Sequence, residues 1–413
     1  MFSFLLFAQV LHFTAAYDNG AGTESPPMGW STWCTNDFCG IPDRCSEYEV
    51  RRKADAMAAQ GMVEMGYKWI LLDDCWAHTE RDENDELQPS PKLFPSGMAA
   101  LAEYVHDLGM KLGLYTCVGT ETCKKGRPGS YGHYEIDANT FAKWKVDMVK
   151  ADNCHRPSNE SQIDLYTQLS QALNATGHPM AFAMCNWGEE NVVDWGGDIS
   201  QMYRIQMDHL PMYNLPTKAQ GAGYGQGVRQ IIDFMADLHP AKYTKPHAWL
   251  DPDFLETLFE PIDAYSTMNF TNSRTEMAFW VLWSVPLLVA TDPADLSEDK
   301  RSILMNEEVL AIHHDPLYIS GERVYNHTNG AEMWSRPLEN GDMAVILFNK
   351  GSLNAIDVGV EWTQLGWEAT DEVSVRCLWG KKDLGVHKFG FVREDLPVHD
   401  NHFLRLSRTN SAK

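Results

Sequence analysis

Short apolar runs alternate with amphipathic or polar stretches from Pro27 to about Asp292, at spacings of roughly 20 to 45 residues. Segments such as Glu47–Met65 and Met98–Leu108 lie between the runs and carry apolar residues at helical spacing. The runs, each long enough for a buried β-strand, are Met28–Trp33, Lys68–Asp74, Lys111–Cys117, Met148–Asp152, Met180–Trp187, Met202–Asp208, His247–Asp253 and Pro286–Asp292. Eight β-α units predict an α/β fold of the (β/α)8, or TIM-barrel, type.

The pattern changes after about Asn306, where turn residues such as Asn340-Gly341-Asp342 separate short segments of alternating polarity. The expected strands are Glu332–Pro337, Met343–Asn349, Ile356–Glu361, Glu372–Trp379 and His402–Leu406. They predict a C-terminal antiparallel β-sandwich domain. We therefore expect three parts, namely a leader over residues 1–16, a catalytic barrel over 17–305 and a sandwich over 306–413.

Residues 1–16 form an apolar run in which Thr14 and Ala16 are placed for cleavage before Tyr17, as in a secretory signal peptide. A basic start is missing, so a retained amino-terminal anchor is the alternative. No later stretch reaches the roughly 18 apolar residues of a membrane span. Four N-x-[ST] triplets are candidate glycosylation sites, at Asn159, Asn174, Asn269 and Asn326. The sequence thus predicts a secreted or lysosomal protein that enters the secretory pathway.

The nine cysteines agree with an oxidising compartment. Seven of them gather in the first part of the chain, at Cys34, Cys39, Cys45, Cys75, Cys117, Cys123 and Cys154. No Cys-x-x-Cys or His-x-x-x-His spacing occurs, so the pattern predicts disulfides rather than a metal site, and no cofactor is expected. The odd number leaves at least one thiol unpaired or linked between chains.

The net charge of −23, from 57 acidic and 34 basic residues, argues against nucleic acid or anionic lipid as a partner. A neutral or polar small substrate fits better. Five of the eight runs end in acidic residues, at Asp73, Asp74, Asp152, Asp208, Asp251, Asp253 and Asp292. This order places a ring of carboxylates at the carboxyl-terminal mouth of the barrel, where active sites lie. Asp292 alone is expected to be a helix N-cap, because Pro293 follows it.

Aromatic side chains occur near the same strand ends, at Trp30, Trp33, Trp76, Tyr115, Trp187 and Trp249. Each one alone is more often a core residue than a binding platform. Beside a ring of carboxylates, however, aromatic faces suit the apolar C–H face of a sugar, while carboxylate and amide oxygens accept hydrogen bonds from its hydroxyl groups.

The stretch Val146–Cys154 joins a buried-strand pattern to a charge pair. In a strand, residues two apart point the same way, so we expect the Lys150 ammonium to lie beside Asp152 and to hold that carboxylate ionised at acidic pH. An ionised and positioned carboxylate is what a nucleophile needs. The alternative is an ordinary structural Lys–Asp pair at a strand end.

Seven motifs, in chain order, resemble those of glycoside hydrolase family 27, the α-galactosidases and α-N-acetylgalactosaminidases. They are Met28-Gly29-Trp30-Ser31-Thr32-Trp33, Leu72-Asp73-Asp74-Cys75-Trp76, Gly113-Leu114-Tyr115, Lys150-Ala151-Asp152-Asn153-Cys154, Cys185-Asn186-Trp187-Gly188, Arg204-x-x-x-Asp208 and Asp251-Pro252-Asp253. The resemblance covers nearly the whole chain after the leader. It implies a retaining hydrolase of terminal α-linked galactose.

On the matching positions, Asp152 is the expected nucleophile and Asp208 the expected acid/base. The resemblance also implies a set of sugar-binding residues, namely Trp33, Asp73, Asp74, Tyr115, Lys150, Asn186, Trp187, Arg204 and Asp253. It implies a Cys123–Cys154 disulfide at the end of the nucleophile strand and a disulfide from Cys75 to the first loop. Two pairings stay open there: Cys39–Cys75 with Cys34–Cys45, or Cys34–Cys75 with Cys39–Cys45.

Some residues depart from the family pattern, including Asn186, Phe254 and the segment Tyr203–Asp208. An α-N-acetylgalactosaminidase or a β-L-arabinopyranosidase of the same family is therefore an alternative, and so is a secreted sugar-binding protein without catalysis. The charged Gly188-Glu189-Glu190 loop favours a free 2-hydroxyl over an acetamido group, and retention of Asp152 and Asp208 argues against a lectin. A homodimer is the expected assembly, if any.

Overall fold

The computed structural model describes residues 17–33, 45–215, 225–259 and 268–409. The expected signal peptide, Cys34 and Cys39 lie outside the described residues. No helix within these ranges is both long and apolar enough to cross a bilayer.

Eight parallel strands form one sheet in the order β7-β6-β5-β4-β3-β2-β1-β8. Their bounds are β1 Met28–Ser31, β2 Trp69–Leu72, β3 Lys111–Cys117, β4 Met148–Asp152, β5 Ala181–Cys185, β6 Met202–Arg204, β7 Trp249–Asp251 and β8 Leu287–Val289. Leu255, just beyond β7, forms a parallel bridge to Val289 of β8, and its N–H donates to Leu288 O at 2.8 Å. This bridge closes the sheet, and the predicted (β/α)8 barrel is confirmed.

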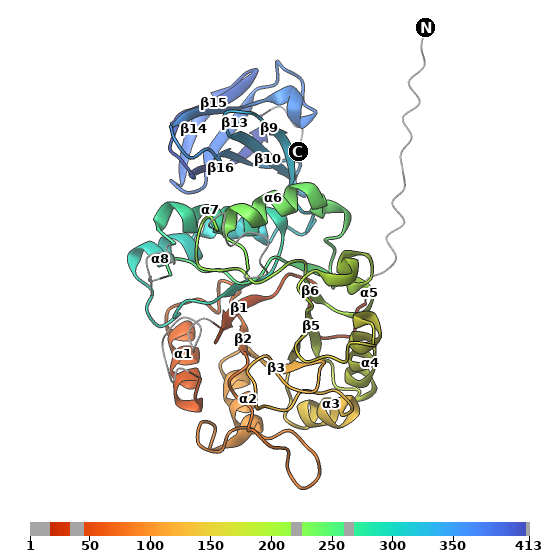
Figure 1. Cartoon of the computed structure of the whole chain (residues 1–413). Helices are drawn as coiled ribbons and strands as arrows, with labels where there is room; N and C mark the ends of the chain where they lie inside the picture. Colours follow the sequence, from red (N-terminus) through yellow and green to blue (C-terminus); the bar gives the residue numbers. More distant parts are fainter. Residues whose placement is uncertain (1–16, 34–44, 216–224, 260–267, 410–413) are drawn as a thin grey trace.

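Helices follow the strands and surround them (Figure 1). They are α1 Glu47–Ala59, α2 Gly97–Asp107, α3 Tyr134–Lys143, α4 Gln162–Ala175, α5 Gly196–Ile199, α6 Val228–Leu238, α7 Phe270–Trp283, α8 Glu298–Leu304 and α9 Glu307–His313, with short 3-10 helices at Glu189–Asp194 and Pro240–Lys242. Side-chain caps begin several of them. Ser46 accepts the N–H of Glu49 at the start of α1, and Ser161 that of Asp164 at the start of α4.

The carboxyl-terminal part has a six-stranded sheet in the order β14-β13-β16-β11-β10-β9 and a two-stranded sheet of β12 and β15. Strand bounds are β9 Glu322–Asn326, β10 Ala331–Pro337, β11 Met343–Asn349, β12 Ile356–Glu361, β13 Val373–Cys377, β14 Lys382–His387, β15 Gly390–Leu396 and β16 Asn401–Arg408. A 3-10 helix, Trp362–Leu365, follows β12. All pairings are antiparallel, as predicted. The sequence missed β9, β14 and β15 because almost none of their residues is buried, so they lack the alternation of buried apolar and exposed polar positions.

Helix α7 lies between the barrel and the sandwich (Figure 1). Nearly every residue from Asn272 to Trp283 is buried. Its Phe279 ring packs edge-on against Trp334 of β10 and Phe348 of β11, with centroids 5.2 and 5.1 Å apart. The Thr275 hydroxyl donates to His399 O at 2.8 Å. Residues of the sandwich thus contact α7 through apolar rings and through a hydrogen bond. The two domains are therefore joined by a shared buried helix rather than by a solvated linker.

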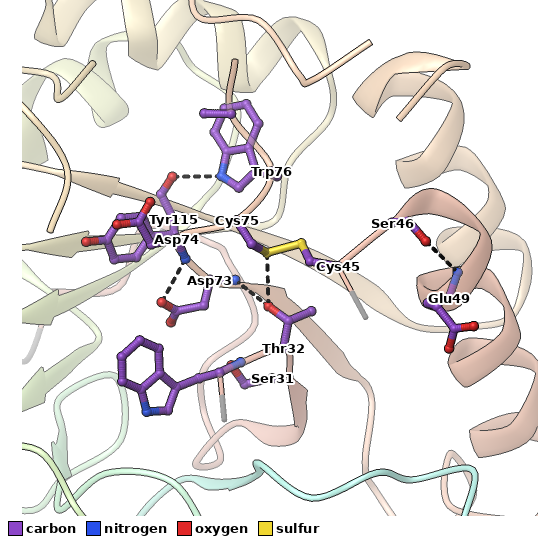
Figure 2. Close-up of a disulfide and its surroundings, with 12 residues drawn as sticks. Ser31, Thr32, Cys45, Ser46, Glu49, Asp73, Asp74, Cys75, Trp76 and Tyr115 are labelled. Atoms are coloured by element: carbon purple, nitrogen blue, oxygen red, sulfur yellow. Dashed lines mark hydrogen bonds between the residues drawn. A yellow bond between two sulfur atoms is a disulfide. The ribbon is translucent and has the colours of Figure 1, made fainter. Parts of the chain in front are cut away.

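Cys75 is bonded to Cys45, which corrects both pairings that we expected for it (Figure 2). Cys45 directly precedes Ser46, the cap of α1, and Cys75 follows β2 by three residues. The first loop returns to the barrel at that point, so the fixed start of α1 brings the Cα atoms of the pair to 6.1 Å. The spacing of the cysteines in the sequence could not show which of them lies where the first loop rejoins the barrel.

The second disulfide joins Cys123 to Cys154 and matches the expected pairing. Cys154 lies two residues beyond Asp152, the last residue of β4, and Cys123 belongs to the loop after β3. The bond therefore ties two neighbouring strand ends together at the mouth of the barrel. Among the described residues, Cys117, Cys185 and Cys377 are free thiols.

Replacing Cys123 and Cys154 together by serine is expected to lower the free energy of unfolding by about 2–4 kcal/mol, since the disulfide closes a loop in the unfolded chain. Denaturant unfolding of the double variant measures the loss, and turnover by the folded fraction reports on the strand end. A midpoint and an activity that both stay unchanged would show that this bond supports neither.

Candidate active site

A parallel sheet brings the ends of its strands to one edge, and here that edge carries the predicted residues. In the register of the sheet, Asp152 of β4 lies between Cys117 of β3 and Cys185 of β5. Arg204 ends the next strand, β6, and Asp251 ends β7. The mouth of the barrel therefore presents acidic and basic side chains from neighbouring strands at one level.

Asp152 accepts two hydrogen bonds, from the Tyr115 hydroxyl at 3.0 Å and from the Asn153 N–H at 2.9 Å. Burial nevertheless raises the pKa of Asp152 to about 7; the Lys150 charge opposes this shift and the Asp208 charge adds to it. The expectation that Lys150 holds Asp152 ionised at acidic pH is thus wrong. Desolvation of the carboxylate outweighs the attraction of the ammonium.

Lys150 instead pairs with Asp73, with Nζ 2.6 Å from Oδ2. Both groups are buried, and Asp73 also accepts the N–H of Asp74 at 2.8 Å. The Lys150 ammonium lies 4.8 Å from the centre of the Phe254 ring and 5.8 Å from that of Trp33. This fixes the cation between the second and fourth strands. Phe254 was not among the predicted site residues.

Arg204 holds two carboxylates at once, because its guanidinium NH2 is 3.0 Å from Asp208 Oδ1 and 2.9 Å from Asp253 Oδ2. Asp253 also accepts the backbone N–H of His209 at 2.8 Å. Burial raises the pKa of Asp208, the Arg204 charge opposes this rise, and the Asp253 charge adds to it. Asp208 is the more open of the two expected catalytic carboxyls, with 36% of its side chain exposed.

Asp74 is turned toward the loop after β3. Its Oδ2 accepts the Lys124 N–H at 2.6 Å and its Oδ1 is 3.5 Å from the Arg127 guanidinium. Burial raises the pKa of Asp74 to about 6, and the nearby Asp73 charge contributes to the shift. The Asp74 carboxylate thus binds this loop of the protein itself.

Asn186 and Trp187 follow β5, where the chain turns sharply. The Asn186 side chain donates to Glu189 O at 3.0 Å, and Trp187 has φ 58°. Gly188, at φ +79°, is the residue this turn requires, since a Cβ there would lie 2.3 Å from Ile205 O. Positive φ at a large aromatic residue is costly and is typical of functional sites.

The carboxylates of Glu189 and Glu190 point to the start of α4 rather than standing free. Glu189 contacts the Arg156 guanidinium at 3.2 Å, and Glu190 accepts the Gln162 N–H at 3.1 Å. The charge of this loop therefore does not support the expected preference for a free 2-hydroxyl, because local partners already bind both side chains.

Asp292 is not the helix N-cap that we expected. Its carboxylate accepts hydrogen bonds from the Lys53 ammonium at 2.6 Å and from the Ala294 N–H at 2.9 Å, whereas Ser297 caps α8.

Asp251 belongs to the site although it was left out of the predicted set. It accepts the Asp253 N–H at 2.8 Å, and burial raises its pKa to about 6. Its position at the end of β7 was the sequence feature that could have indicated it.

The described residues contain no group of three or more His, Cys, Asp or Glu side chains arranged to hold a metal ion. The chemistry available at the mouth is that of carboxyl groups in different surroundings. Asp152 is buried among hydrogen-bond donors, and Asp208 is partly open and bound to Arg204. Two carboxyls of this kind suit acid/base and nucleophilic catalysis, and the roles assigned to individual residues stay predictions.

Comparison with known proteins extends over both domains. The family described as "Alpha galactosidase A" matches residues 25–315, and the "Alpha galactosidase C-terminal beta sandwich domain" matches residues 328–406. An alpha-galactosidase of Cyamopsis tetragonoloba is 37% identical over 88% of this chain and 81% of its own. An alpha-N-acetylgalactosaminidase of Gallus gallus is 35% identical over 81% of this chain and 80% of its own.

Among solved structures, alpha-galactosidase I from Mortierella vinacea superposes with a TM-score of 0.87 at 29% identity, covering 96% of this chain and all of that one. Sequence and fold therefore agree over the barrel and the sandwich together. The chain belongs to the alpha-galactosidase (melibiase) family, glycoside hydrolase family 27.

Proposed function

We propose that this chain is an exo-acting α-galactosidase that removes terminal α-D-galactosyl residues from glycolipids, glycoproteins or oligosaccharides with retention of configuration. The observation that carries the proposal is the placement of Asp152 and Asp208 at one barrel mouth in unlike environments. Family membership supports the same reaction class. The proposal assigns Asp152 as the nucleophile and Asp208 as the acid/base.

In the first step an oxygen of the Asp152 carboxylate attacks the anomeric carbon, and the bond to the leaving oxygen breaks. Asp208 gives its proton to that oxygen, so the aglycone leaves as a neutral alcohol. A covalent β-linked galactosyl-enzyme results. In the second step the Asp208 carboxylate takes a proton from water, the water oxygen attacks the anomeric carbon, and Asp152 is released as α-galactose forms.

The remaining residues are proposed to bind and orient the sugar. The paired Asp73 and Lys150 offer an acceptor and a donor for its hydroxyls, and the half-buried rings of Trp33 and Trp187 line the pocket. The Tyr115 hydroxyl steadies the nucleophile by its hydrogen bond to Asp152. The proposed sugar-binding set is Trp33, Asp73, Asp74, Tyr115, Lys150, Asn186, Trp187, Arg204 and Asp253.

An α-N-acetylgalactosaminidase is the second candidate, because a relative of that name matches most of the chain. A β-L-arabinopyranosidase is the third candidate; a solved structure of that name shares the fold of this chain at 20% identity. A lectin is disfavoured, since sugar binding alone needs neither Asp152 nor Asp208. The assay described below separates these candidates.

We also propose entry into the secretory pathway, with residues 1–16 as signal peptide, 17–305 as catalytic barrel and 306–413 as accessory sandwich. Of the candidate glycosylation sites, Asn159, Asn269 and Asn326 are exposed. Asn174 is half-buried and donates to Ser170 O at 2.8 Å, within the same helix. The two disulfides fit an oxidising compartment. Homodimer formation stays a prediction.

Release of p-nitrophenol from the α-galactoside is expected to exceed release from the α-N-acetylgalactosaminide and the β-L-arabinopyranoside by about tenfold or more in kcat/KM, a difference of ~1.4 kcal/mol in transition-state binding. Steady-state rates on the three substrates decide between the candidates. A reversed order would replace the proposed substrate, and sugar binding without any release would favour the lectin.

Asp152→Asn is expected to abolish turnover of every glycoside, since no glycosyl-enzyme can form. Asp208→Ala should still attack a dinitrophenyl galactoside, whose leaving group needs little protonation, giving a burst of phenol and then slow turnover. Added azide should accelerate the second step and yield the α-galactosyl azide, because attack on a β-linked intermediate inverts it. If Asp208→Ala is as inactive as Asp152→Asn on this substrate, the assigned roles are wrong.

A bell-shaped pH dependence with an acidic optimum is expected, because Asp152 must be ionised while Asp208 is protonated. Burial and the Asp208 charge raise the pKa of Asp152, so the acidic limb should lie above the ordinary aspartate range. In Asp208→Ala the basic limb, measured as kcat/KM on the dinitrophenyl galactoside, should disappear, because no proton donor is left to ionise. A basic limb that persists in Asp208→Ala would contradict the assignment of Asp208 as the proton donor.

A further inference from the structure

The loop that carries Asp253 begins and ends in left-handed backbone, with φ 85° at Asp253 and φ 49° at Leu258. Such angles are unfavourable for residues with a side chain, so the surrounding structure must hold the loop in this shape. The loop matters for the reaction because the Asp253 carboxylate contacts the same Arg204 nitrogen that contacts Asp208. The residues that contact this loop on the side away from Arg204 therefore determine how firmly Asp208, the proposed acid/base, is positioned.

One face of α7 supplies these partners. Trp280 Nε1 donates to Asp253 O at 2.9 Å, Glu276 Oε1 accepts the Glu256 N–H at 2.9 Å, and Ser273 Oγ accepts the Leu258 N–H at 2.8 Å. Positions 273, 276 and 280 are three and four residues apart, which is the spacing of one helical face. All three side chains are buried. They contact the loop at its beginning, its middle and its end.

Glu276 also reaches the segment that bears the acid/base itself. Its Oε1 lies 3.6 Å from Nδ1 of His209, the residue after Asp208. The His209 Nδ1 is 2.9 Å from Phe254 O, and because a carbonyl only accepts, this nitrogen carries the hydrogen. The same His209 donates its backbone N–H to the Asp253 carboxylate. Glu276 thus contacts both the Asp253 loop and the chain next to Asp208, and so does Trp280, whose ring centroid lies 5.5 Å from that of His209.

We propose that Glu276 is a positioning residue for Asp208, acting through the Asp253–Leu258 loop and His209 rather than through contact with substrate. With the loop in place, Asp253 holds Arg204 and Arg204 directs the Asp208 carboxyl to the leaving oxygen. Without it, the strained loop relaxes and the proton donor is misplaced. The inference rests on the proposed role of Asp208 as acid/base.

The charge state of Glu276 provides a conservative variant. Burial raises the pKa of Glu276 to about 8, although the Glu256 N–H and the Thr257 hydroxyl favour its ionised form. Glu276 is therefore neutral at acidic pH, where the enzyme is expected to work, and glutamine reproduces its shape and its acceptor oxygen. Methionine has a similar length but leaves the Glu256 N–H buried without an acceptor.

The experiment compares kcat/KM on two substrates, a phenyl galactoside that needs protonation of its leaving group and a dinitrophenyl galactoside that does not. Glu276→Met is expected to lose about 10- to 100-fold on the phenyl galactoside, the usual effect of a misplaced catalytic group. Its rate on the dinitrophenyl galactoside should change far less. Glu276→Gln should restore the wild-type ratio. Trp280→Phe, which removes the N–H donated to Asp253 together with part of the ring that packs against His209, should show the same selectivity and decides the matter if the methionine variant does not fold.

Tyr67→Phe is the matched control. The buried Tyr67 hydroxyl donates to Leu304 O at 2.7 Å, and Tyr67 precedes β2, so the bond lies at the opposite end of the barrel. This variant should lose stability without changing the ratio of the two rates. Equal losses on both substrates in Glu276→Met and Trp280→Phe, or no loss, would overturn the inference. If Asp208→Ala itself shows no selectivity between the substrates, the proposed function fails instead.

Discussion

The mouth of the barrel contains more buried negative charge than positive charge, and the chemistry of the site depends on that imbalance. Lys150 is paired with Asp73, and Arg204 is shared by Asp208 and Asp253. Asp152 has no ion pair of its own among the residues that the structure describes. Desolvation, with repulsion from neighbouring carboxylates added to it, raises the pKa values of both Asp152 and Asp208. Such a pair retains a proton in weakly acidic solution, and an acid/base and a nucleophile need one ionised and one protonated group.

The order of strands along the chain explains why so much of this site was predictable. Acidic residues at the ends of buried apolar runs must meet at one edge of a parallel sheet, so Asp73, Asp152 and Asp253 could be placed without coordinates. The bounds of β3 and β4, two short runs with apolar residues at their centre or start, were predicted to the residue. The two domains were predictable for the same reason, since their patterns have different periods.

What could not be predicted were the choices between partners that lie far apart in sequence. Lys150 has Asp152 two residues away, but it pairs with Asp73 across the barrel, which only the packed structure shows. The partner of Cys75 depended on where the first loop returns, and the exposed β14 and β15 carry no apolar alternation. Glu256 and Glu276 are buried carboxyls on the outer side of the site. Their residue type indicates exposure, so a single sequence gives no sign of them.

The burial of α7 on every side has a consequence for how the chain is made. The rings of Trp334 and Phe348 that cover Phe279 are synthesised well after the helix itself. Until they emerge, Phe279 lacks the two rings that cover it, and exposed apolar surfaces of this kind bind chaperones or aggregate. We therefore expect the barrel to complete its packing only after the sandwich strands have been synthesised. Substitutions in the late strands are expected to reduce the yield of folded enzyme even where they lie far from the mouth of the barrel.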